Sequence, residues 1–187
     1  MYDSEIYKLI LMQPHMRKLF KGFYARDNLP HLTPSDLKQD FSIILNTDKF
    51  EDSGQHWILF HWDSSKNTAF FIDPLANPLH REFQELLKCC HTIVVLRNPV
   101  QHHLSVLCGL FVLYFMYYLC SGQSIVDIIN SFSQNNLHVN DDLVVKFAKQ
   151  KLHISQVYKL GRKRGNNKNV EDWMSRKSIN LWLHKER

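Results

Sequence analysis

The segment QHHLSVLCGLFVLYFMYYLC, residues 101–120, decides the fold of this chain. From Val106 to Cys120 every residue is apolar, aromatic or glycine, and two histidines stand shortly before the run. A membrane-spanning helix needs about 20 apolar residues, so the run is too short for one. A helix that is hydrophobic on all sides belongs in a protein interior. The sequence therefore predicts a central buried helix over 108–119.

The clearest strands precede this helix. Residues 55–62 (QHWILFHW) and 68–73 (TAFFID) flank the turn-forming segment DSSKN, a pattern that predicts a β-hairpin. Residues 41–46 and 91–96 are rich in β-branched and other apolar side chains and favour two more strands. We expect an α+β fold, in which a small mixed β-sheet packs on the buried central helix and further helices flank it.

The remaining segments give weaker signals. Residues 33–36 (TPSD) place a threonine, a proline and an aspartate where a helix start favours them, and predict a helix of about two turns that ends near Asp40. Residues 21–32, which hold a glycine and a proline, are expected to be irregular. Further helices are expected at 3–12, 79–90, 124–132, 140–152 and 171–183.

Composition narrows the class of protein. The chain has 187 residues, of which 44% are hydrophobic, enough to bury a core. Acidic residues stand near the N-terminus where a secretory signal needs basic ones, so we expect a protein that is not exported and four cysteines that are free thiols. No His or Cys pair has zinc-finger or HExxH spacing, and we expect no metal and no small-molecule cofactor.

The positive charge is concentrated at the C-terminal end. Residues 159–187 hold nine Lys or Arg and three Asp or Glu, a net charge of +6, whereas residues 1–158 carry −1. We expect a single domain over 1–158 and a basic extension over 159–187. Such an extension suits a polyanion such as DNA, or simply keeps the protein soluble. The candidate DNA contacts are Lys159, Arg162, Lys163, Arg164 and Lys168.

Cys108 stands where the loop ends and the buried helix is expected to begin. Unpaired N–H groups at a helix N-terminus lower a thiol pKa and favour the nucleophilic thiolate. Gly109 has no Cβ and would let a substrate backbone approach closely. The alternative is ordinary, because a cysteine in an apolar run is usually a small buried hydrophobic residue.

A catalytic cysteine needs a base and a group that orients the base. The expected hairpin brings His56, at the start of its first strand, near Asp73, at the end of its second. Gln101 lies in the loop before the helix and could offer a side-chain amide to an oxyanion, beside the N–H of Cys108. Each residue alone has a structural explanation; their order and placement together favour a catalytic site.

These positions make the sequence resemble the adenovirus-type cysteine endopeptidases, in the clan that includes the SUMO-cleaving proteases. The motifs are GQHWILFHW, FFIDPL and VQHHLSVLCGLF, with LFKGFYARDNLP nearer the N-terminus. As in that family, His56 and Asp73 are seventeen residues apart, and Gln101 precedes Cys108 by seven. The resemblance covers residues 19–119, somewhat more than half of the chain.

The resemblance implies a role for each matched residue. Cys108 is the nucleophile, His56 the general base and then acid, Asp73 the residue that orients the imidazole, and Gln101 the oxyanion donor. Trp57 matches the tryptophan packed beside the site. At the position of Asp73 the adenoviral enzymes typically carry glutamate, whereas the SUMO-protease branch carries aspartate as this chain does. Other DNA viruses and adenovirus-like mobile elements therefore fit as a source as well.

The resemblance also implies two activators. One is a short viral peptide joined by a disulfide to Cys90, which lies eleven residues before Gln101; alternatively, Cys90 is only the last core residue of the 79–90 helix, with Cys89 facing outward. The other is DNA, which the basic extension would contact through phosphates in a salt-sensitive way.

We therefore expect a monomeric thiol endopeptidase, without membrane contacts, that cleaves viral capsid or core precursor proteins during virion maturation. The resemblance implies glycine-containing cleavage sites with an apolar residue upstream, and a location in the virion and the host nucleus. Two alternatives stay open: a protease that removes SUMO or another ubiquitin-like protein, and a non-enzymatic DNA-binding virion protein.

Overall fold

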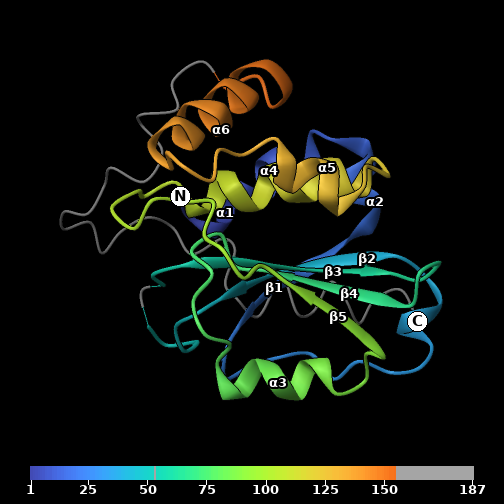
Figure 1. The fold of residues 1–187 in the computed structure, drawn as a ribbon. Helices are drawn as coiled ribbons and strands as arrows, with labels where there is room; N and C mark the ends of the chain where they lie inside the picture. The colour runs from blue at the N-terminus through green and yellow to red at the C-terminus, as the bar shows by residue number, and fades with distance from the viewer. Residues whose placement is uncertain (53, 155–187) are drawn as a thin grey trace.

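The computed structural model describes residues 1–52 and 54–154, and within them the chain forms three layers (Figure 1). Above a five-stranded sheet lie α1 (Asp3–Leu11), α2 (Pro14–Leu19), α4 (Cys108–Cys120), α5 (Ile125–Asn130) and α6 (His138–Lys151), and below it lies α3 (Arg81–Leu87). The strands are β1 (Phe20–Ala25), β2 (Phe41–Asn46), β3 (Trp57–Asp63), β4 (Thr68–Ile72) and β5 (Thr92–Val95). This architecture confirms the expected α+β class.

The sheet is mixed, and its strands follow the chain in the order β1-β2-β3-β4-β5. The three central strands are antiparallel, and an outer strand adds in parallel at each edge. Because side chains alternate along a strand, Ile44 and Leu59 belong to the core above the sheet, whereas Ile43 and Phe60 belong to the core below it. The central strands are therefore buried on both faces.

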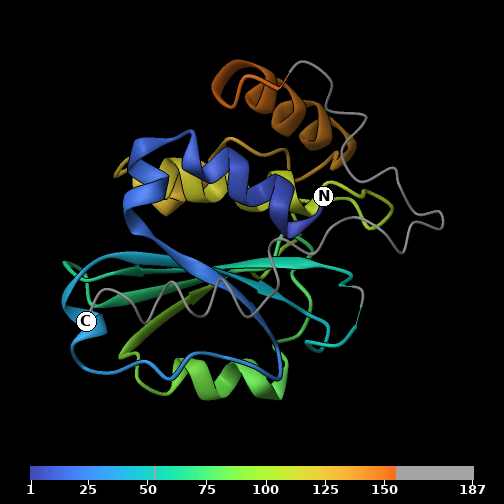
Figure 2. The same ribbon diagram turned by 180° about the vertical axis from the view of Figure 1, so that it is seen from behind.

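Helix α4 forms the centre of the upper layer, as the sequence predicts. Four successive residues that point to all sides of the helix, Leu110, Phe111, Val112 and Leu113, are each 0% exposed. The helix packs on β3 below and is covered by α1, α2 and α6 (Figure 2). In the described part of the chain no helix is long and apolar enough to span a membrane.

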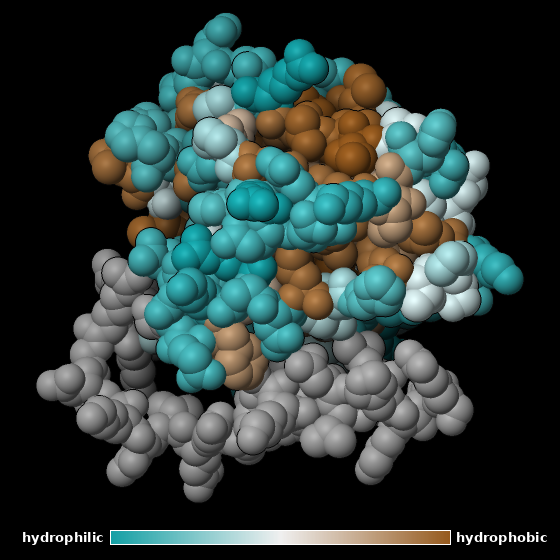
Figure 3. Space-filling view, turned by 90° about the horizontal axis from the view of Figure 1, so that it is seen from below, coloured by the Kyte–Doolittle hydropathy of each residue, from teal (hydrophilic) through white to brown (hydrophobic). Residues whose placement is uncertain are grey.

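The lower layer is thinner. Helix α3 buries Phe83, Leu86 and Leu87 against the sheet. Seen from this side, hydrophobic surface lies beside a band of hydrophilic side chains (Figure 3). The edge strand β5 contributes apolar surface, because Ile93 and Val95 are 41% and 42% exposed.

The prediction that residues 21–32 are irregular is wrong for their first part, which forms β1. This strand pairs in parallel with β2, and its register shifts between Phe20 and Gly22. Gly22 adopts a φ of 147° there, which glycine allows at little cost. Parallel pairing joins segments that are distant in sequence, so the local pattern does not reveal it.

The two-turn helix expected after TPSD is also wrong, since only a single 3₁₀ turn forms, at Asp36–Lys38. The Asp36 carboxylate accepts hydrogen bonds from the Thr33 backbone N–H and hydroxyl, at 2.9 and 2.6 Å, which closes a tight turn. Asp40 then binds Ser64 of the β3–β4 turn, and the chain enters β2 at once.

Helix α2 is not among the predicted helices, and the remaining described elements match their predictions apart from their ends. The helix expected at 79–90 is α3 and stops at Leu87, and the helix expected at 140–152 is α6 and begins at His138. The helix expected at 171–183 and the basic extension over 159–187 lie outside the described residues.

A cluster of three polar side chains, Ser42, His61 and Cys120, joins α4 to the sheet. His61 and Ser42 are 4% and 0% exposed, and the Ser42 hydroxyl lies 2.8 Å from His61 Nδ1 and 3.6 Å from the Cys120 sulfur. Burial lowers the pKa of His61 to about 4 and raises that of the Cys120 thiol to about 11. Both groups are therefore neutral near pH 7 and act as a structural link.

The depressed pKa of His61 makes stability depend on pH. Between its unfolded pKa near 6.5 and its folded pKa near 4, the unfolded chain binds the proton more tightly, so stability falls as the pH falls. Relative to a His61→Gln variant, the unfolding free energy of the wild type should drop by up to about 3 kcal/mol between pH 7 and pH 4, measured by urea unfolding. An exposed-site control, His31→Gln, should follow the wild type; a pH-independent difference for His61→Gln would contradict the interpretation.

Candidate active site

The β3–β4 pair brings His56 and Asp73 together, as the hairpin predicts. His56 immediately precedes β3 and Asp73 immediately follows β4, so the antiparallel pairing places the two residues at the same end of the sheet. His56 Nε2 and Asp73 Oδ1 are 2.6 Å apart, and both side chains are largely buried. The other ring nitrogen, Nδ1, is left for a second partner.

The turn after β4 fixes the Asp73 carboxylate. Its Oδ1 also accepts the Leu75 backbone N–H at 2.9 Å, and its Oδ2 accepts the Asn77 side-chain amide at 3.0 Å. A carboxylate that accepts several hydrogen bonds is held in one rotamer. Asp73 can therefore hold the His56 ring in a fixed orientation.

Cys108 is the first residue of α4 and is 8% exposed. Burial alone would raise its pKa, but the hydrogen bond from His56 and the imidazolium charge outweigh burial, and the backbone N–H of Trp57 helps. The net effect is a Cys108 pKa below its ordinary value. The thiol is thus the group that the sequence identified as a nucleophile, in the environment that such a group requires.

His56 shifts in the opposite direction. Burial would lower its pKa, but its hydrogen bonds and charge interactions with Asp73 and Cys108 raise the pKa to about 9. The two opposite shifts favour a thiolate–imidazolium pair. This pair can attack an electrophilic carbon and then supply a proton to a leaving group.

Gln101 is buried in the loop that leads to Cys108, with 1% of its surface exposed, and its backbone N–H donates to the carbonyl of Pro74, the residue after Asp73. Its amide Nε2 donates to the Ser105 carbonyl at 2.9 Å, which fixes which end of the amide is the donor. Its Oε1 is buried without a hydrogen-bond partner. One further N–H remains for an oxyanion, so the role of Gln101 stays a prediction.

The first residue of the chain lies between Trp57 and Gly109. Trp57 Nε1 donates to the Met1 carbonyl at 3.0 Å. A Cβ added at Gly109 would meet Met1 side-chain atoms at 3.1 Å and Ile6 Cδ1 at 3.3 Å. The absence of a side chain at Gly109 therefore makes room for the chain's own first helix; a close approach of substrate at this point stays a prediction.

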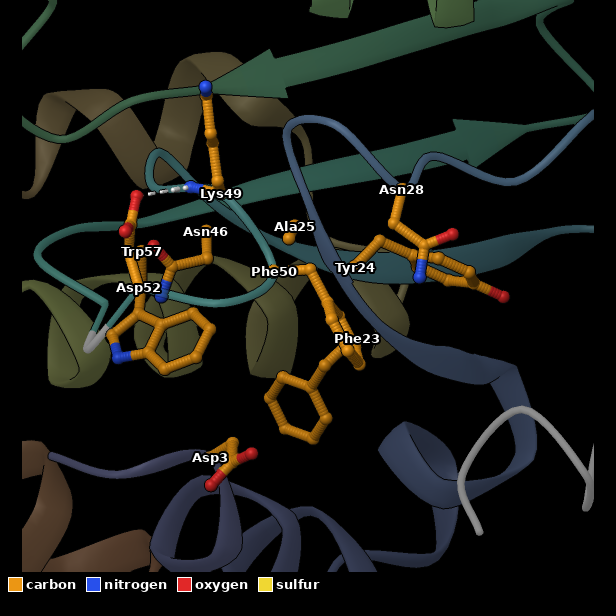
Figure 4. Close-up of a pocket in the computed structure, with 10 residues that line it drawn as sticks. All are labelled: Asp3, Phe23, Tyr24, Ala25, Asn28, Asn46, Lys49, Phe50, Asp52 and Trp57. Atoms are coloured by element: carbon orange, nitrogen blue, oxygen red, sulfur yellow. Dashed lines mark hydrogen bonds between the residues drawn. The ribbon is translucent and has the colours of Figure 1, made fainter. Parts of the chain in front are cut away.

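A cavity opens on the other side of Trp57 (Figure 4). Its walls include the rings of Phe23 and Trp57, whose centroids are 5.7 Å apart, and Asp3 lies at its lower edge in this view. Asn46 lies between the ring of Trp57 and Phe50. The cavity is a recess with aromatic walls, which the sequence did not reveal because its residues come from separate segments of the chain.

Cys90 lies between α3 and β5 and is partly buried against the lower core. Its sulfur is 3.8 Å from that of Cys89, which is exposed as expected. Burial and the neighbouring Cys89 raise the pKa of Cys90 to about 12. Cys90 is thus a protonated thiol close to the free edge of the sheet.

Two further predictions concern metals and DNA. In residues 1–52 and 54–154, no group of three or more His, Cys, Asp or Glu side chains is arranged to hold a metal ion. Lys159, Arg162, Lys163, Arg164 and Lys168 lie outside the described residues, so their contact with DNA stays a prediction.

The site brings together a cysteine at a helix N-terminus, a histidine and an orienting carboxylate, with a buried glutamine in the loop that leads to the cysteine. This combination defines the class of the cysteine peptidases. The chain belongs to the adenovirus endoprotease family, whose model matches residues 20–187. The match extends well beyond Leu119, where the resemblance read from the motifs ended.

Individual relatives are adenovirus proteins named protease. The bovine adenovirus 7 protease is 29% identical over 136 residues, 58% of this chain and 67% of the relative. The human adenovirus B serotype 3 protease is 30% identical over 115 residues, 54% of this chain and 50% of the relative. The protease of porcine adenovirus A serotype 3 is 33% identical over 39% of this chain, and the match spans 44% of the relative. The matches thus cover between about two fifths and two thirds of these relatives' lengths.

Two solved structures are similar to the chain. The ASFV pS273R protease gives a TM-score of 0.47 with 17% identity, over 68% of this chain and 59% of that one. The SUMO protease Ulp1, with its catalytic cysteine oxidized to a sulfonic acid, gives a TM-score of 0.38 with 14% identity, over 78% of this chain and 66% of that one.

The opposed pKa shifts predict selective reactivity. Between pH 6 and 8, iodoacetamide should label Cys108 at least about ten times faster than Cys120, whose thiol is protonated in this range. A His56→Ala variant loses the two largest effects that lower the Cys108 pKa, so Cys108 should lose most of this advantage. Peptide mapping by mass spectrometry measures both rates in one sample. Equal labelling of the two cysteines in the wild type would contradict the assigned ion pair.

Proposed function

We propose that the protein is a thiol endopeptidase that cleaves viral precursor proteins during virion maturation. The observation that carries the proposal is the 2.6 Å contact between His56 and Asp73, with Cys108 hydrogen-bonded to the same imidazole. Membership of the adenovirus endoprotease family supports the substrate class. The basic extension and the location in the virion and host nucleus belong to the same proposal.

The geometry supports a two-step reaction. The Cys108 sulfur attacks the scissile carbonyl carbon, and the carbonyl electron pair moves to oxygen, where the Cys108 N–H and the Gln101 amide can stabilise it. His56 Nδ1 gives its proton to the leaving nitrogen, the C–N bond breaks, and a thioester remains. Water then attacks the thioester and gives a proton to His56, and the thiolate departs, which restores the starting pair.

The cavity beside Trp57 supports the expectation that cleavage sites carry an apolar residue upstream of glycine. Its aromatic walls, Phe23 and Trp57, suit an apolar side chain of the substrate. Residues between this side chain and the buried Cys108 sulfur must pass Trp57 closely, which favours glycine there. A peptide with an apolar residue upstream of Gly-Gly is therefore the substrate to test first.

Substituting the nucleophile tests the proposal. Cys108→Ala should lower cleavage of such a peptide by at least about three orders of magnitude while the thermal unfolding midpoint changes little. Cys120→Ala is the matched control, since this cysteine belongs to the same helix and should leave turnover nearly intact. Wild-type turnover should fall as the pH rises through about 9, where His56 loses its proton. Cleavage retained in Cys108→Ala would sink the proposal, and hydrolysis confined to SUMO or ubiquitin fusions would support the deconjugating alternative.

An activating peptide, joined to Cys90 by a disulfide, is part of the proposal. Cys90 lies just before β5, a free sheet edge with exposed Ile93 and Val95. An extended peptide can pair with such an edge through backbone hydrogen bonds. A cysteine on the peptide would then lie near Cys90.

The two adjacent cysteines allow a paired comparison. With a cysteine-containing peptide from the viral precursor under mild oxidation, Cys89→Ser should retain the mixed disulfide and the gain in turnover, and Cys90→Ser should lose both. Intact-mass spectrometry and the cleavage rate provide the two readouts. A disulfide that forms only through Cys89, or equal activation of both variants, would contradict the role of Cys90.

DNA is the second proposed activator. The support is the net charge of +6 over residues 159–187, against −1 for the rest of the chain. Phosphate contacts of this kind bind without sequence preference and weaken as salt rises.

A further inference from the structure

The first turn of α6 contacts the loop that carries Gln101 at three separate points. Asn140 Nδ2 donates to the Val100 carbonyl at 2.8 Å. The ring of His138 stacks on that of His102, with centroids 3.9 Å apart. Asp141 is hydrogen-bonded to Ser105, whose carbonyl receives the Gln101 amide.

Asn140 is the most buried of these contacts, with 1% of its surface exposed. Besides the bond to Val100, its Nδ2 donates to the Ser133 carbonyl at 2.9 Å, and its Oδ1 accepts the Ser133 N–H at 2.8 Å. Three hydrogen bonds nearly saturate a side-chain amide. The Asn140 side chain therefore has one position, and the Val100 carbonyl is fixed against it.

The opposite side of the same loop segment is held by the catalytic turn. The backbone N–H groups of Val100 and Gln101 both donate to the Pro74 carbonyl, at 2.9 and 3.0 Å. Pro74 follows Asp73 directly. The peptide unit that carries the Gln101 side chain is thus clamped between the turn of the orienting carboxylate and helix α6.

We propose that Asn140, with the first turn of α6, positions the Gln101 amide for the oxyanion. This inference rests on the proposed function, in which that amide stabilises the negative oxygen. Without Asn140 the Val100 carbonyl loses a buried donor and shifts to find another partner, and Gln101 moves with it. The thiolate–imidazolium pair is held by β3, β4 and α4 and does not depend on this contact, so Asn140 acts on one part of the site alone.

Two reactions of Cys108 distinguish an effect on the Gln101 amide from an effect on the Cys108–His56 pair. Iodoacetamide reacts at a saturated carbon and forms no oxyanion, whereas hydrolysis of acetyl-Leu-Gly-Gly-aminomethylcoumarin passes through one. Asn140→Ala should lower kcat for the coumarin substrate by about 10- to 100-fold, with KM nearly unchanged, while the iodoacetamide rate at Cys108 stays within about twofold of wild type. Binding of acetyl-Leu-Gly-Gly-aldehyde, whose adduct places an oxygen at the same point, should weaken in parallel with kcat.

Two further variants keep the test sharp. Asn136→Ala is the matched control, because Asn136 stands two residues before the same helix, accepts the His138 N–H and is not among the residues whose side chains bind the loop; its kcat should equal that of the wild type. His138→Ala removes an exposed ring and serves if Asn140→Ala does not fold. It should lower kcat by a few fold at an unchanged iodoacetamide rate.

The outcomes are distinct. Unchanged kcat in the α6 variants, or an equal fall of kcat and iodoacetamide rate, overturns the positioning role while the proposed function stands. A wild type that neither hydrolyses the coumarin substrate nor binds the aldehyde overturns the proposed function, and this inference falls with it.

Discussion

The antiparallel register of β3 on β4 is the constraint on which the rest of the structure depends. Leu59 pairs with Ile72, and continuing this register past the strand ends places Asp73 opposite Ile58, next to His56. A slip of β4 by one residue would exchange its two faces, so that Phe70 and Ile72, which now belong to the core above the sheet, would point toward α3. The two hydrophobic cores therefore fix the register, and the register fixes the distance between the imidazole and the carboxylate.

The pKa of the buried Cys108 thiol is lowered because a charged partner lies beside it. A lone buried thiol would stay protonated, as Cys120 does with its pKa raised to about 11. Cys108 lies on the same helix but has an imidazolium beside it, and its pKa moves in the opposite direction. Both thiols are largely buried, so burial alone does not explain the difference, and the His56 partner is the largest of the effects that lower the Cys108 pKa.

The sequence was sufficient where the signals are local. A turn-rich segment between two alternating strands predicted the hairpin, and an unbroken apolar run predicted α4; family motifs then marked His56, Asp73 and Cys108. The misses are contacts between distant segments. Strand β1 forms by parallel pairing with β2, Gly109 faces Met1 and Ile6, and Asn140 binds Val100 forty residues earlier in the chain. No local pattern carries such contacts, because each exists only after the layers have assembled.

The three parts of the site are held by forces of different strength. Helix α4 is fixed by apolar burial on all sides, and β3 and β4 by a ladder of backbone hydrogen bonds. The loop over residues 97–107 buries Val100 in the upper core but is otherwise held by a few polar contacts with the Pro74 turn and α6. Each such bond contributes only about 1 kcal/mol net. Cys108 and His56 are therefore attached to rigid elements, whereas Gln101 lies on a loop that fewer contacts hold, so in the proposed mechanism the oxyanion donor is the part of the site that can move without disturbing either core.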